Sequence, residues 1–599
     1  MCGIVGYVGK EKVVSKLIQG LKKLEYRGYD SAGIAFQDAR GNIKIFKTVG
    51  RVLNLEEKIS FKEEAMIGIG HTRWATHGSV TKVNSHPHRV GRVTIVHNGI
   101  LENYQELKDL LLKEGYKFQS DTDTEVVCCY IDFLCQKRNT SDILDVLFEC
   151  TKVFLGSYAI AVLIEGRQDE LFVMKKDSPL IIGLGEGENY IASDISAYAD
   201  CASSYIQLKD LEIGIIRKDE VQIFRNGKQC VLEIKDVDKT FQGSDKKDFK
   251  HYMLKEIYEQ IELINKWNNI YFNENKLEKL PVINKYKKIH IIGCGTAYHA
   301  GLVGKYLLER YGDIEVFVFI ASEYRYQKLF VDKDTLVIAI SQSGETADTL
   351  ACLKRVKDYK AHTLGIVNVR DSSIARLVDE VIYTEAGMEV AVASTKAYVA
   401  QIYIFTLLAL KLGIAIKKLY LDEIKQLYME LPESISQLIH YPYSKIVKLL
   451  YNENTIFYLG RGIDYISMLE GSLKLKEISY IHSEAMPAGE LKHGTISLID
   501  KKIKVVALIT SEEIISKTIS NIKEIKARGA KVILITNPIF KQYGDKSCYD
   551  EIVLVPKTDD LLQPILNVIP LQMIAYKVAL KKGLDIDMPR NLAKSVTVE

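Results

Sequence analysis

The chain has 599 residues, of which 47% are hydrophobic and 26% are charged, as is typical of folded globular proteins. One hydrophobic core does not support that length, so we expect two to four domains. The formal net charge of +3 argues against a nucleic-acid-binding surface, and no apolar run reaches the ~20 residues of a membrane-spanning helix. Without a secretory leader or a Cys-x-x-Cys pair, the sequence predicts a cytoplasmic protein with reduced cysteines.

Residues 2–240 predict an α+β domain in which helices cover strand-rich sheets. Short apolar runs that end in polar residues predict its strands, and apolar residues at helical spacing predict a helix. The predicted strands are Ile4–Val8, Ala32–Phe36, Ile67–Arg73, Val93–Gly99, Tyr158–Ile164 and Leu171–Met174, and the predicted helix is Val13–Leu24.

A polar stretch, Gln242–Asp248, follows this domain and predicts a linker. His251–Asn268 then predicts a charged amphipathic helix, which we expect to be a solvated connector. The linker and the connecting helix together occupy residues 241–278.

From Lys287 onward, strands alternate with helices, which predicts an α/β fold with a parallel sheet. The strand Ile289–Ile292 leads into the turn Gly293–Thr296, and the strand Leu336–Ile340 leads into the loop Ser341–Thr346. A helix is predicted after each of these turns.

The second half of the chain repeats this pattern at a spacing of about 167–170 residues. Ile456–Gly462 is similar to the first Gly-x-Gly turn, Val505–Ser511 is similar to the second strand, and Val578–Gly583 is similar to Leu408–Gly413. Because this spacing far exceeds that of solenoid repeats, it indicates a duplicated domain. The predicted α/β domains, each with a parallel sheet, span 279–418 and 447–589, and an extended tail spans 590–599.

Cys2 is the first candidate for chemistry. Removal of Met1 would give one residue both a thiol, with a reference pKa of about 8.5, and an α-amine, with a pKa of about 7.7–8.0. The amine could then accept the proton of the thiol, so one residue would supply nucleophile and base. The ordinary alternative is a small apolar residue at the start of a strand.

Polar side chains at other strand ends would complete a site around such a nucleophile. If Cys2 attacks a primary amide, the side chain of Asn98 and the backbone N–H of Gly99 fit an oxyanion hole. Arg73 and Asp123 carry the charges that would hold the α-carboxylate and α-ammonium of glutamine. The nearby histidines match no standard zinc spacing, so the sequence predicts neither a metal site nor a cofactor. They are His71, His77, His86 and His88.

Four motifs together resemble class II glutamine amidotransferases, which have an N-terminal-nucleophile fold and hydrolyse glutamine to glutamate and ammonia. The motifs are Met1–Gly6, Leu24–Gly33, His71–Gly78 and His97–Ile100. The resemblance implies that Cys2 is the nucleophile, that Asn98 and Gly99 donate to the oxyanion, and that Trp74 lies on a mobile loop over the site. The implied glutamine-binding residues are Arg73, Trp74, Thr76, His77, His86 and Asp123.

The loop Ser341–Thr346 lies between a strand and a helix, where hydroxyls, backbone N–H groups and the helix N-terminus suit a phosphate. Such loops are also ordinary capped turns. Phosphoribosyl-pyrophosphate amidotransferases carry an Asp-Asp motif after an apolar strand. Asp559 and Asp560 lack such a strand, so the sequence argues against that class of enzyme. The Ser-Gly-Gly-x-Asp-Ser loop of asparagine synthetases is absent from the sequence.

This loop, the turn Gly293–Thr296 and the duplication resemble paired sugar isomerase (SIS) domains. With the amidotransferase motifs, nearly the whole chain resembles the family of isomerizing glutamine–fructose-6-phosphate aminotransferases, and the tail Asp587–Glu599 is highly specific to that family. The resemblance implies that glutamine and fructose 6-phosphate give glutamate and glucosamine 6-phosphate, at the start of hexosamine biosynthesis. It also implies a water-shielded path for ammonia from Cys2 to Lys594.

The chemistry of a ketose substrate fits several residues of this second half. Lys594 is the candidate for an imine with the sugar. Lys474 and Glu477 lie three residues apart on a predicted helix, where Glu477 could move a proton and Lys474 could stabilise an enolate, or both could form a surface salt bridge. The resemblance implies that His493 from a neighbouring subunit assists ring opening, and hence a homodimer. The implied sugar-phosphate contacts are Thr296, Ser341, Gln342, Ser343, Thr346, Val392, Ser394 and Ala593.

Two other interpretations share the SIS domains. One is a regulator that senses sugar phosphates, and the other is a deglycase that degrades amine-bearing sugars. The regulator needs neither a nucleophile nor a lysine tail, so Cys2, Glu477 and Lys594 argue against it. The deglycase gains little from a complete glutamine site. Ala297 stands where many members of the resembled family have serine, which removes one potential hydrogen bond to the sugar.

Overall fold

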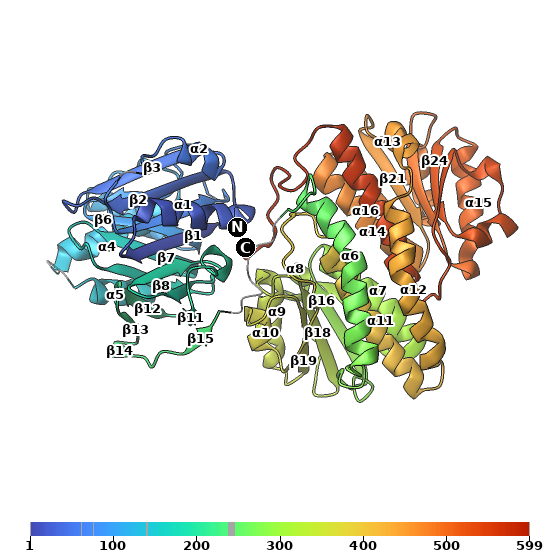
Figure 1. Cartoon of the computed structure of the whole chain (residues 1–599), viewed down its shortest axis with the longest axis horizontal. Coiled ribbons are helices and arrows are strands. Elements are labelled where there is room, and N and C mark those ends of the chain that lie inside the picture. The colour runs from blue at the N-terminus through green and yellow to red at the C-terminus, as the bar shows by residue number, and fades with distance from the viewer. Residues whose placement is uncertain are drawn as a thin grey trace. The chain divides into compact units, whose positions relative to one another are not determined.

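The computed structural model describes residues 2–61, 63–75, 77–138, 140, 142–237 and 246–597. The chain forms two compact units, one of Met1–Ser244 with Ala593–Glu599 and one of Asp245–Leu592, and Figure 1 labels their elements. Most of the predicted linker Gln242–Asp248 lies outside the described residues.

The first unit contains two antiparallel β-sheets, which confirms the predicted α+β class. The eight-stranded sheet has the order β15-β11-β9-β10-β1-β4-β2-β3, and the seven-stranded sheet has the order β14-β13-β12-β8-β7-β6-β5. The strands of the first sheet are β1 (Gly3–Gly9), β2 (Ser31–Gln37), β3 (Ile43–Val49), β4 (Ile67–Arg73), β9 (Ile181–Leu184), β10 (Glu188–Ala192), β11 (Ser204–Gln207) and β15 (Ile234–Asp236). Those of the second sheet are β5 (His88–Val90), β6 (Val93–Leu101), β7 (Gly156–Ile164), β8 (Leu171–Lys176), β12 (Glu212–Ile216), β13 (Val221–Arg225) and β14 (Lys228–Gln229).

Helices cover the outer faces of these two sheets. One apolar core joins the inner faces of both sheets, a second packs α1 and α2 on the eight-stranded sheet, and a third packs α3, α4 and α5 on the seven-stranded sheet. The helices are α1 (Val13–Leu24), α2 (Val52–Glu56), α3 (Tyr104–Lys113), α4 (Asp123–Arg138) and α5 (Ile143–Val153). The alternation of inward and outward side chains along each strand therefore builds a sandwich of four layers.

β1 lies in the middle of the eight-stranded sheet, between β10 and β4. Its register pairs Gly3 with Thr72 and Ile4 with His71. Because β1 and β4 run antiparallel, the start of β1 meets the end of β4, and Cys2 lies beside the residues that follow Arg73.

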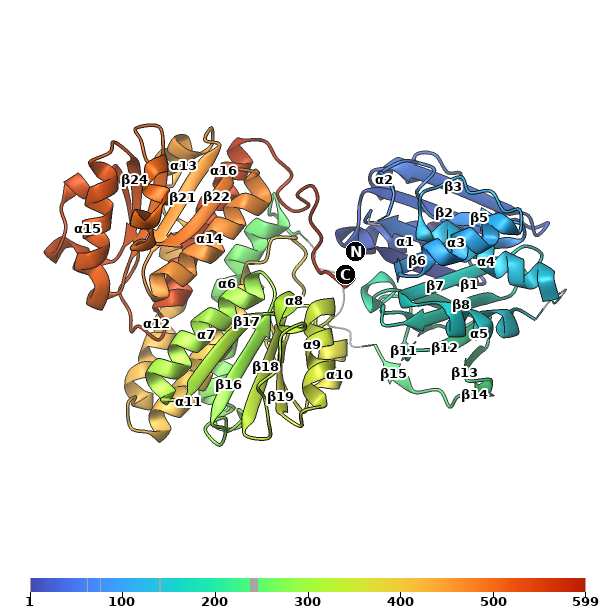
Figure 2. The ribbon, with the colours of Figure 1, turned by 180° about the vertical axis from the view of Figure 1, so that it is seen from behind.

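The second unit contains two five-stranded parallel sheets with the same strand order, which confirms the predicted pair of α/β domains. Helices pack on both faces of these sheets, as Figure 2 shows for β16, β18 and β19. The first sheet has the order β17-β16-β18-β19-β20, built from β16 (Lys288–Gly293), β17 (Glu315–Ile320), β18 (Thr335–Ser341), β19 (His362–Val367) and β20 (Glu380–Tyr383). The second has the order β22-β21-β23-β24-β25, built from β21 (Thr455–Gly460), β22 (His482–Pro487), β23 (Lys504–Ile509), β24 (Lys531–Thr536) and β25 (Glu551–Leu554).

The duplication extends to individual backbone angles. Gly295 and Gly462 precede the first helix of each copy, and both have a φ of +54°, a left-handed conformation that favours glycine. These helices, α7 (Thr296–Gly312) and α14 (Ile463–Ser479), are both 17 residues long. Each ends at a residue in the left-handed conformation, Asp313 or Tyr480.

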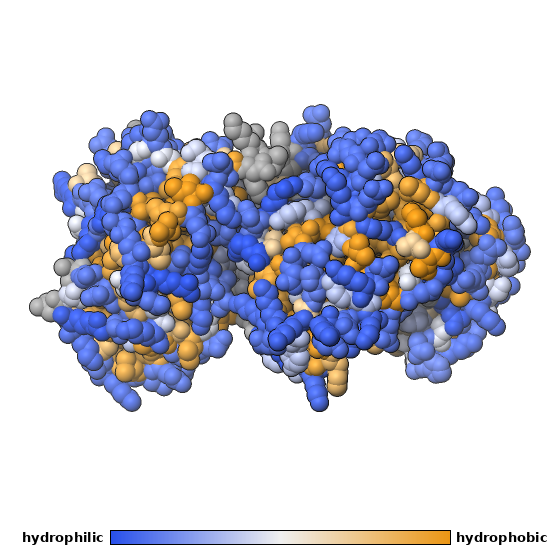
Figure 3. Space-filling model, turned by 90° about the horizontal axis from the view of Figure 1, so that it is seen from below, coloured by the Kyte–Doolittle hydropathy of each residue, from blue (hydrophilic) through white to orange (hydrophobic). Residues whose placement is uncertain are grey.

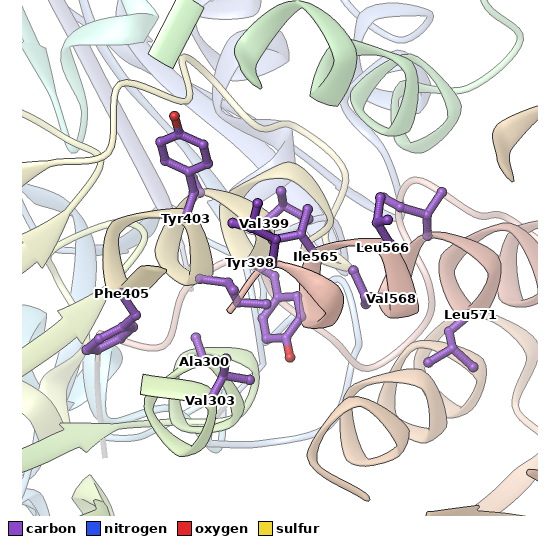
Figure 4. Packing of buried hydrophobic residues seen from close by; sticks show 14 of the residues in the cluster. Ala300, Val303, Tyr398, Val399, Tyr403, Phe405, Ile565, Leu566, Val568 and Leu571 are labelled. Carbon is purple, nitrogen blue, oxygen red and sulfur yellow. The ribbon is translucent and has the colours of Figure 1, made fainter. Parts of the chain in front are cut away.

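A single apolar core joins the two copies inside the second unit. Figure 4 shows Ala300 and Val303 of α7 packed near Tyr398 of α11 and Ile565 of α16. The remaining helices of this unit are α6 (Tyr252–Asn268), α8 (Ala321–Tyr324), α9 (Ala347–Lys357), α10 (Ser373–Leu377), α11 (Lys396–Ala415), α12 (Leu421–Ile439), α13 (Ser444–Leu450), α15 (Ile515–Lys526) and α16 (Gln563–Lys581).

The expectation that His251–Asn268 forms a solvated connector is wrong. The helix forms as α6, but Met253, Ile257, Ile264 and Trp267 are buried in the core of the second unit. These positions are three, four or seven residues apart, so they form one apolar stripe that faces inward, and Lys255 and Glu256 are buried as well.

Among the described residues, one helix, α11, is long and apolar enough to cross a membrane. Its most apolar window is 89% buried inside the unit, as in a core helix of a globular protein. The face of the molecule shown in Figure 3 is mostly hydrophilic, with separate hydrophobic patches.

Candidate active sites

The thiol of Cys2 lies against the backbone of Trp74. The Trp74 N–H donates to Sγ at 3.2 Å, and the thiol donates to the Trp74 carbonyl at 3.4 Å. The Trp74 ring contacts Tyr29 edge-on, with 6.1 Å between ring centroids. The turn after β4 therefore holds the sulfur through the main chain.

Burial raises the pKa of the Cys2 thiol, although the Trp74 N–H and the Arg73 guanidinium act in the opposite direction. The group is thus a protonated thiol at neutral pH. A nucleophilic role at this position requires a base beside it, because the thiolate rather than the thiol attacks.

Asn98 of β6 links the start of β1 to the second sheet. Its Nδ2 donates to the Cys2 carbonyl at 3.0 Å and to Oγ of Ser193 at 2.8 Å. The same Ser193 hydroxyl accepts the Ile4 N–H at 2.8 Å. Ser193 could not be predicted as a member of this site, because it lies far along the chain from both of its partners.

Gly99 occupies a position that no other residue fits. Its φ is +139°, and a Cβ there would lie 2.0 Å from the carbonyl oxygen of Ser157 on the paired strand. This close approach holds the Gly99 backbone against β7, two residues before the end of β6.

Arg73 and Asp123 are buried, and both bind backbone groups. Arg73 donates to the carbonyls of His77, Gly78 and Ser79, and so shapes the loop after β4. Asp123, the first residue of α4, accepts the Leu101 N–H at 2.9 Å. Their predicted roles in binding glutamine stay predictions, and Thr76 lies outside the described residues.

Four buried histidines cluster behind Asn98. The rings of His71 and His86 stack with 4.1 Å between centroids, and His86 meets His88 edge-on at 5.1 Å. The His97 N–H donates to Nδ1 of His86 at 3.4 Å. Burial lowers the pKa of all four rings, that of His71 to about 3, so they are neutral at physiological pH. His77 lies outside this cluster, edge-on to Tyr104 at 5.2 Å.

The second unit holds a buried charge cluster between α7 and α14. Lys474 is 1% exposed, and its Nζ lies 2.6 Å from Glu477, 3.3 Å from Glu470 and 3.1 Å from Oγ1 of Thr296. Glu470 also accepts from Thr296 at 3.0 Å and lies 2.8 Å from Nδ1 of His299. A surface salt bridge between Lys474 and Glu477 is thus excluded.

The two carboxylates outweigh burial and raise the pKa of Lys474, so its ammonium stays charged. Burial alone would raise the pKa of Glu470, but Lys474 and His299 bring it below its ordinary value. Glu470 is not among the predicted site residues, although its spacing of four residues from Lys474 places both on one face of α14.

The loop Ser341–Thr346 folds around its own hydroxyls. Oγ of Ser341 lies 2.8 Å from Oγ1 of Thr346 and accepts the Gly344 N–H at 3.0 Å, and Oγ of Ser343 accepts the Glu345 N–H at 3.2 Å. Gly344 has a φ of +66°, and a Cβ there would collide with Ser372. The loop ends at the N-terminus of α9, with Gln342 and Ser343 partly exposed.

The remaining predicted sugar-site residues lie on the segment before α11, on a 3₁₀ helix and in the C-terminal tail. The Val392 N–H donates to the Asp587 carbonyl at 2.9 Å, and Ser394 lies two residues before α11. His493 is exposed at the end of a 3₁₀ helix. Ala593 and Lys594 are half-buried and belong to the first unit.

Two known domain types match the chain. The glutamine amidotransferase domain matches residues 75–200, and the SIS domain matches residues 282–411 and 449–582.

Curated relatives match the chain from end to end. The isomerizing glutamine–fructose-6-phosphate aminotransferase of Clostridium tetani is 47% identical over 623 residues, covering 100% of both chains. That of Pyrococcus horikoshii is 44% identical over 608 residues, again covering 100% of both. The chain belongs to the isomerizing glutamine–fructose-6-phosphate aminotransferase family.

A solved structure from this aminotransferase family supports the assignment of the second unit. The C-terminal domain of glucosamine-fructose-6-phosphate aminotransferase from Francisella tularensis is 37% identical, with a TM-score of 0.53. It covers 58% of this chain and 100% of that one. Membership in the aminotransferase family confirms the resemblance inferred from the motifs, and neither a deglycase nor a sugar-phosphate sensor is favoured.

Proposed function

We propose that this chain transfers the amide nitrogen of L-glutamine to D-fructose 6-phosphate and isomerises the product, giving L-glutamate and D-glucosamine 6-phosphate, the first step of hexosamine biosynthesis. The end-to-end match to aminotransferases of this name carries the proposal. The half-buried Cys2 thiol in one unit and the buried Lys474 cluster in the other supply two centres for the two halves of the reaction.

In the first half, Met1 is removed and the α-amine of Cys2 takes the proton of the thiol. The thiolate attacks the carboxamide carbon of glutamine, and Asn98 with the Gly99 N–H stabilises the oxyanion. The carbon–nitrogen bond then breaks, ammonia leaves with the transferred proton, and water hydrolyses the thioester to glutamate. In the structure, the Asn98 amide N–H donates to the Cys2 carbonyl. The substrate oxyanion must therefore replace that carbonyl as the acceptor.

Glutamine needs a cation for its α-carboxylate and an anion for its α-ammonium. Arg73 and Asp123 fit these roles, with Trp74, Thr76, His77 and His86 around them. The buried guanidinium uses three backbone carbonyls as acceptors, and its remaining N–H donors are available to a carboxylate.

In the second half, the phosphate of the sugar binds Ser341, Gln342, Ser343 and Thr346 at the N-terminus of α9. Lys594 forms an imine at C2 of the opened ketose with loss of water, and ammonia then displaces the lysine. Glu477 moves the proton from C1 to C2, while the Lys474 ammonium stabilises the enol-like intermediate. Thr296, Val392, Ser394 and Ala593 contact the sugar.

The proposed active protein is a cytoplasmic homodimer without a metal or cofactor. His493 serves ring opening in the neighbouring subunit, consistent with its exposed position on its own chain. A water-shielded path carries ammonia to the sugar, since free ammonia is protonated in bulk solvent. The proposed domains are 2–240, 279–418 and 447–589, joined by a linker and helix at 241–278 and followed by the tail 590–599.

Incubation with glutamine and fructose 6-phosphate tests this function, with glutamate and glucosamine 6-phosphate both assayed. We expect equal amounts of the two products. Cys2→Ala should abolish glutamine-dependent synthesis but keep sugar isomerisation, whereas Lys594→Ala should keep basal glutamine hydrolysis. Glutamate without amino sugar from the unmodified protein would contradict the transferase activity.

A further inference from the structure

His71 makes a hydrogen-bond pattern that fixes its own tautomer. Its Nε2 lies 3.1 Å from the carbonyl oxygen of His97 and 3.0 Å from the side-chain oxygen of Asn98. A backbone carbonyl only accepts hydrogen bonds, so Nε2 must carry the proton. His71 is 1% exposed.

This tautomer determines which way the Asn98 amide points. Amide nitrogen and oxygen are easily confused from shape alone, but an amide N–H facing the Nε2–H of His71 would set two donors against each other. The oxygen therefore faces His71, and Nδ2 faces the Cys2 carbonyl at 3.0 Å and Ser193 at 2.8 Å. If the amide were reversed, its oxygen would face the Cys2 carbonyl oxygen, and two partial negative charges would lie side by side.

We propose that His71 is a positioning residue, which holds the Asn98 amide so that its N–H rather than its oxygen faces the oxyanion formed at Cys2. This inference rests on the proposed glutaminase function. Two features keep the donor in place. The His71 ring stacks on His86 with 4.1 Å between centroids, and its low pKa keeps the ring neutral with a single N–H at working pH.

The chain offers matched variants for a test in the full-length protein. His71→Phe keeps the ring stack but removes the donor. His71→Gln places an amide N–H near the position of Nε2, whereas the shorter His71→Asn carries the same group out of reach. His88→Phe is the control, because His88 belongs to the same buried cluster but bonds Thr122 instead of Asn98.

Steady-state glutamine hydrolysis and the affinity for the γ-aldehyde of glutamine are measured for each variant. The aldehyde forms a tetrahedral adduct with Cys2 and so reports on the oxyanion site. Loss of one oxyanion donor costs about 10²–10³-fold in kcat, so we expect His71→Phe and His71→Asn to lower kcat and aldehyde affinity by about 10–100-fold, with KM nearly unchanged. His71→Gln should stay within about threefold of the unmodified protein, and so should His88→Phe.

A double-mutant cycle with Asn98→Ala separates positioning from a general structural role. If His71 acts through Asn98, His71→Phe should cost little in the Asn98→Ala background. An equal loss in both backgrounds, or an unchanged kcat in both His71→Phe and His71→Asn, would overturn the proposal. Absence of glutamine hydrolysis in the unmodified protein would overturn the proposed function itself, which distinguishes the two failures.

Discussion

At the scale of single residues, the environment of Lys474 decides its chemistry. Two carboxylates within 3.3 Å keep its ammonium charged although the Lys474 side chain is 1% exposed. A fixed cation in such a site interacts strongly with negative charge that develops on a substrate. Helical spacing predicts that Lys474 and Glu477 share a face, but burial depends on α7 packing over α14, which no local pattern reveals.

Removal of Glu470 tests how far the cluster depends on its buried anion. Glu470→Ala leaves Lys474 with one carboxylate and removes the acceptor of the Thr296 hydroxyl and of His299, so we expect the second unit to lose about 3 kcal/mol of stability. Sugar isomerisation should fall with it. The chain has two tryptophans, Trp74 and Trp267, so Trp267 fluorescence in a Trp74→Phe background reports urea unfolding of this unit alone.

The ion pair of exposed Lys492 and half-buried Glu524, 2.8 Å apart, supplies the control for this measurement. Glu524→Ala should change stability by less than about 1 kcal/mol, because surface ion pairs contribute little. Equal losses from Glu470→Ala and Glu524→Ala would show that the buried cluster has no special role in stability.

At the scale of elements, α6 shows how a charged helix can be part of a core. Glu256 is fully buried and accepts the N–H groups of Val390 and Ala391 at 2.5 and 3.2 Å. The charge pattern of the helix could not predict this, because the two partners lie on a loop more than a hundred residues later. The bonds fix the segment that carries Val392 and Ser394.

Glu256→Ala should loosen that segment, because two buried N–H groups lose their acceptor. We expect a loss of about 2–4 kcal/mol in stability and a KM for fructose 6-phosphate that rises several-fold. Glutamine hydrolysis should be unaffected. Glu262→Ala, at an exposed position of the same helix, should leave both properties unchanged, and an unchanged KM in Glu256→Ala would argue against a contact between this segment and the sugar.

At the scale of the whole molecule, the sequence predicts much of the architecture. Long apolar runs and glycine turns identify the strands of the parallel sheets, and the duplication appears in their spacing. The motifs near Cys2 likewise indicate a glutaminase site. Contacts such as those of Ser193 and Glu470 could not be predicted, because they depend on how separate elements pack.

The two copies in the second unit differ at the loop proposed for phosphate. By their strand and helix boundaries, Ser341–Thr346 corresponds to Ile509–Ile514, so Ile509 and Ile514 replace the hydroxyls of Ser341 and Thr346. In the second copy, the buried carboxylate of Asp464 accepts the Thr510 and Ser511 N–H groups at 2.8 and 3.3 Å. A side chain of the protein thus takes up donors that would otherwise serve an anion.

We therefore predict one sugar-phosphate site per chain. Calorimetric titration of the Cys2→Ala protein with fructose 6-phosphate should give a stoichiometry of one. Ser341→Ala with Thr346→Ala should abolish this binding, while Thr510→Ala should leave it unchanged. A stoichiometry of two would contradict the interpretation that the Asp464 carboxylate takes the place of a phosphate at the loop Ile509–Ile514.

Polar contacts of α7 and α14 join the two copies of the second unit. Lys474 of α14 reaches Thr296 at the start of α7, and Arg310, at the position in α7 that corresponds to Glu477, reaches Glu513 of the second loop at 3.3 Å. Each copy thus extends a helix toward a loop of the other, although the two contacts join non-equivalent positions. A displacement of one copy against the other would therefore disturb the Lys474 cluster, which couples the integrity of the proposed catalytic centre to the packing of both copies.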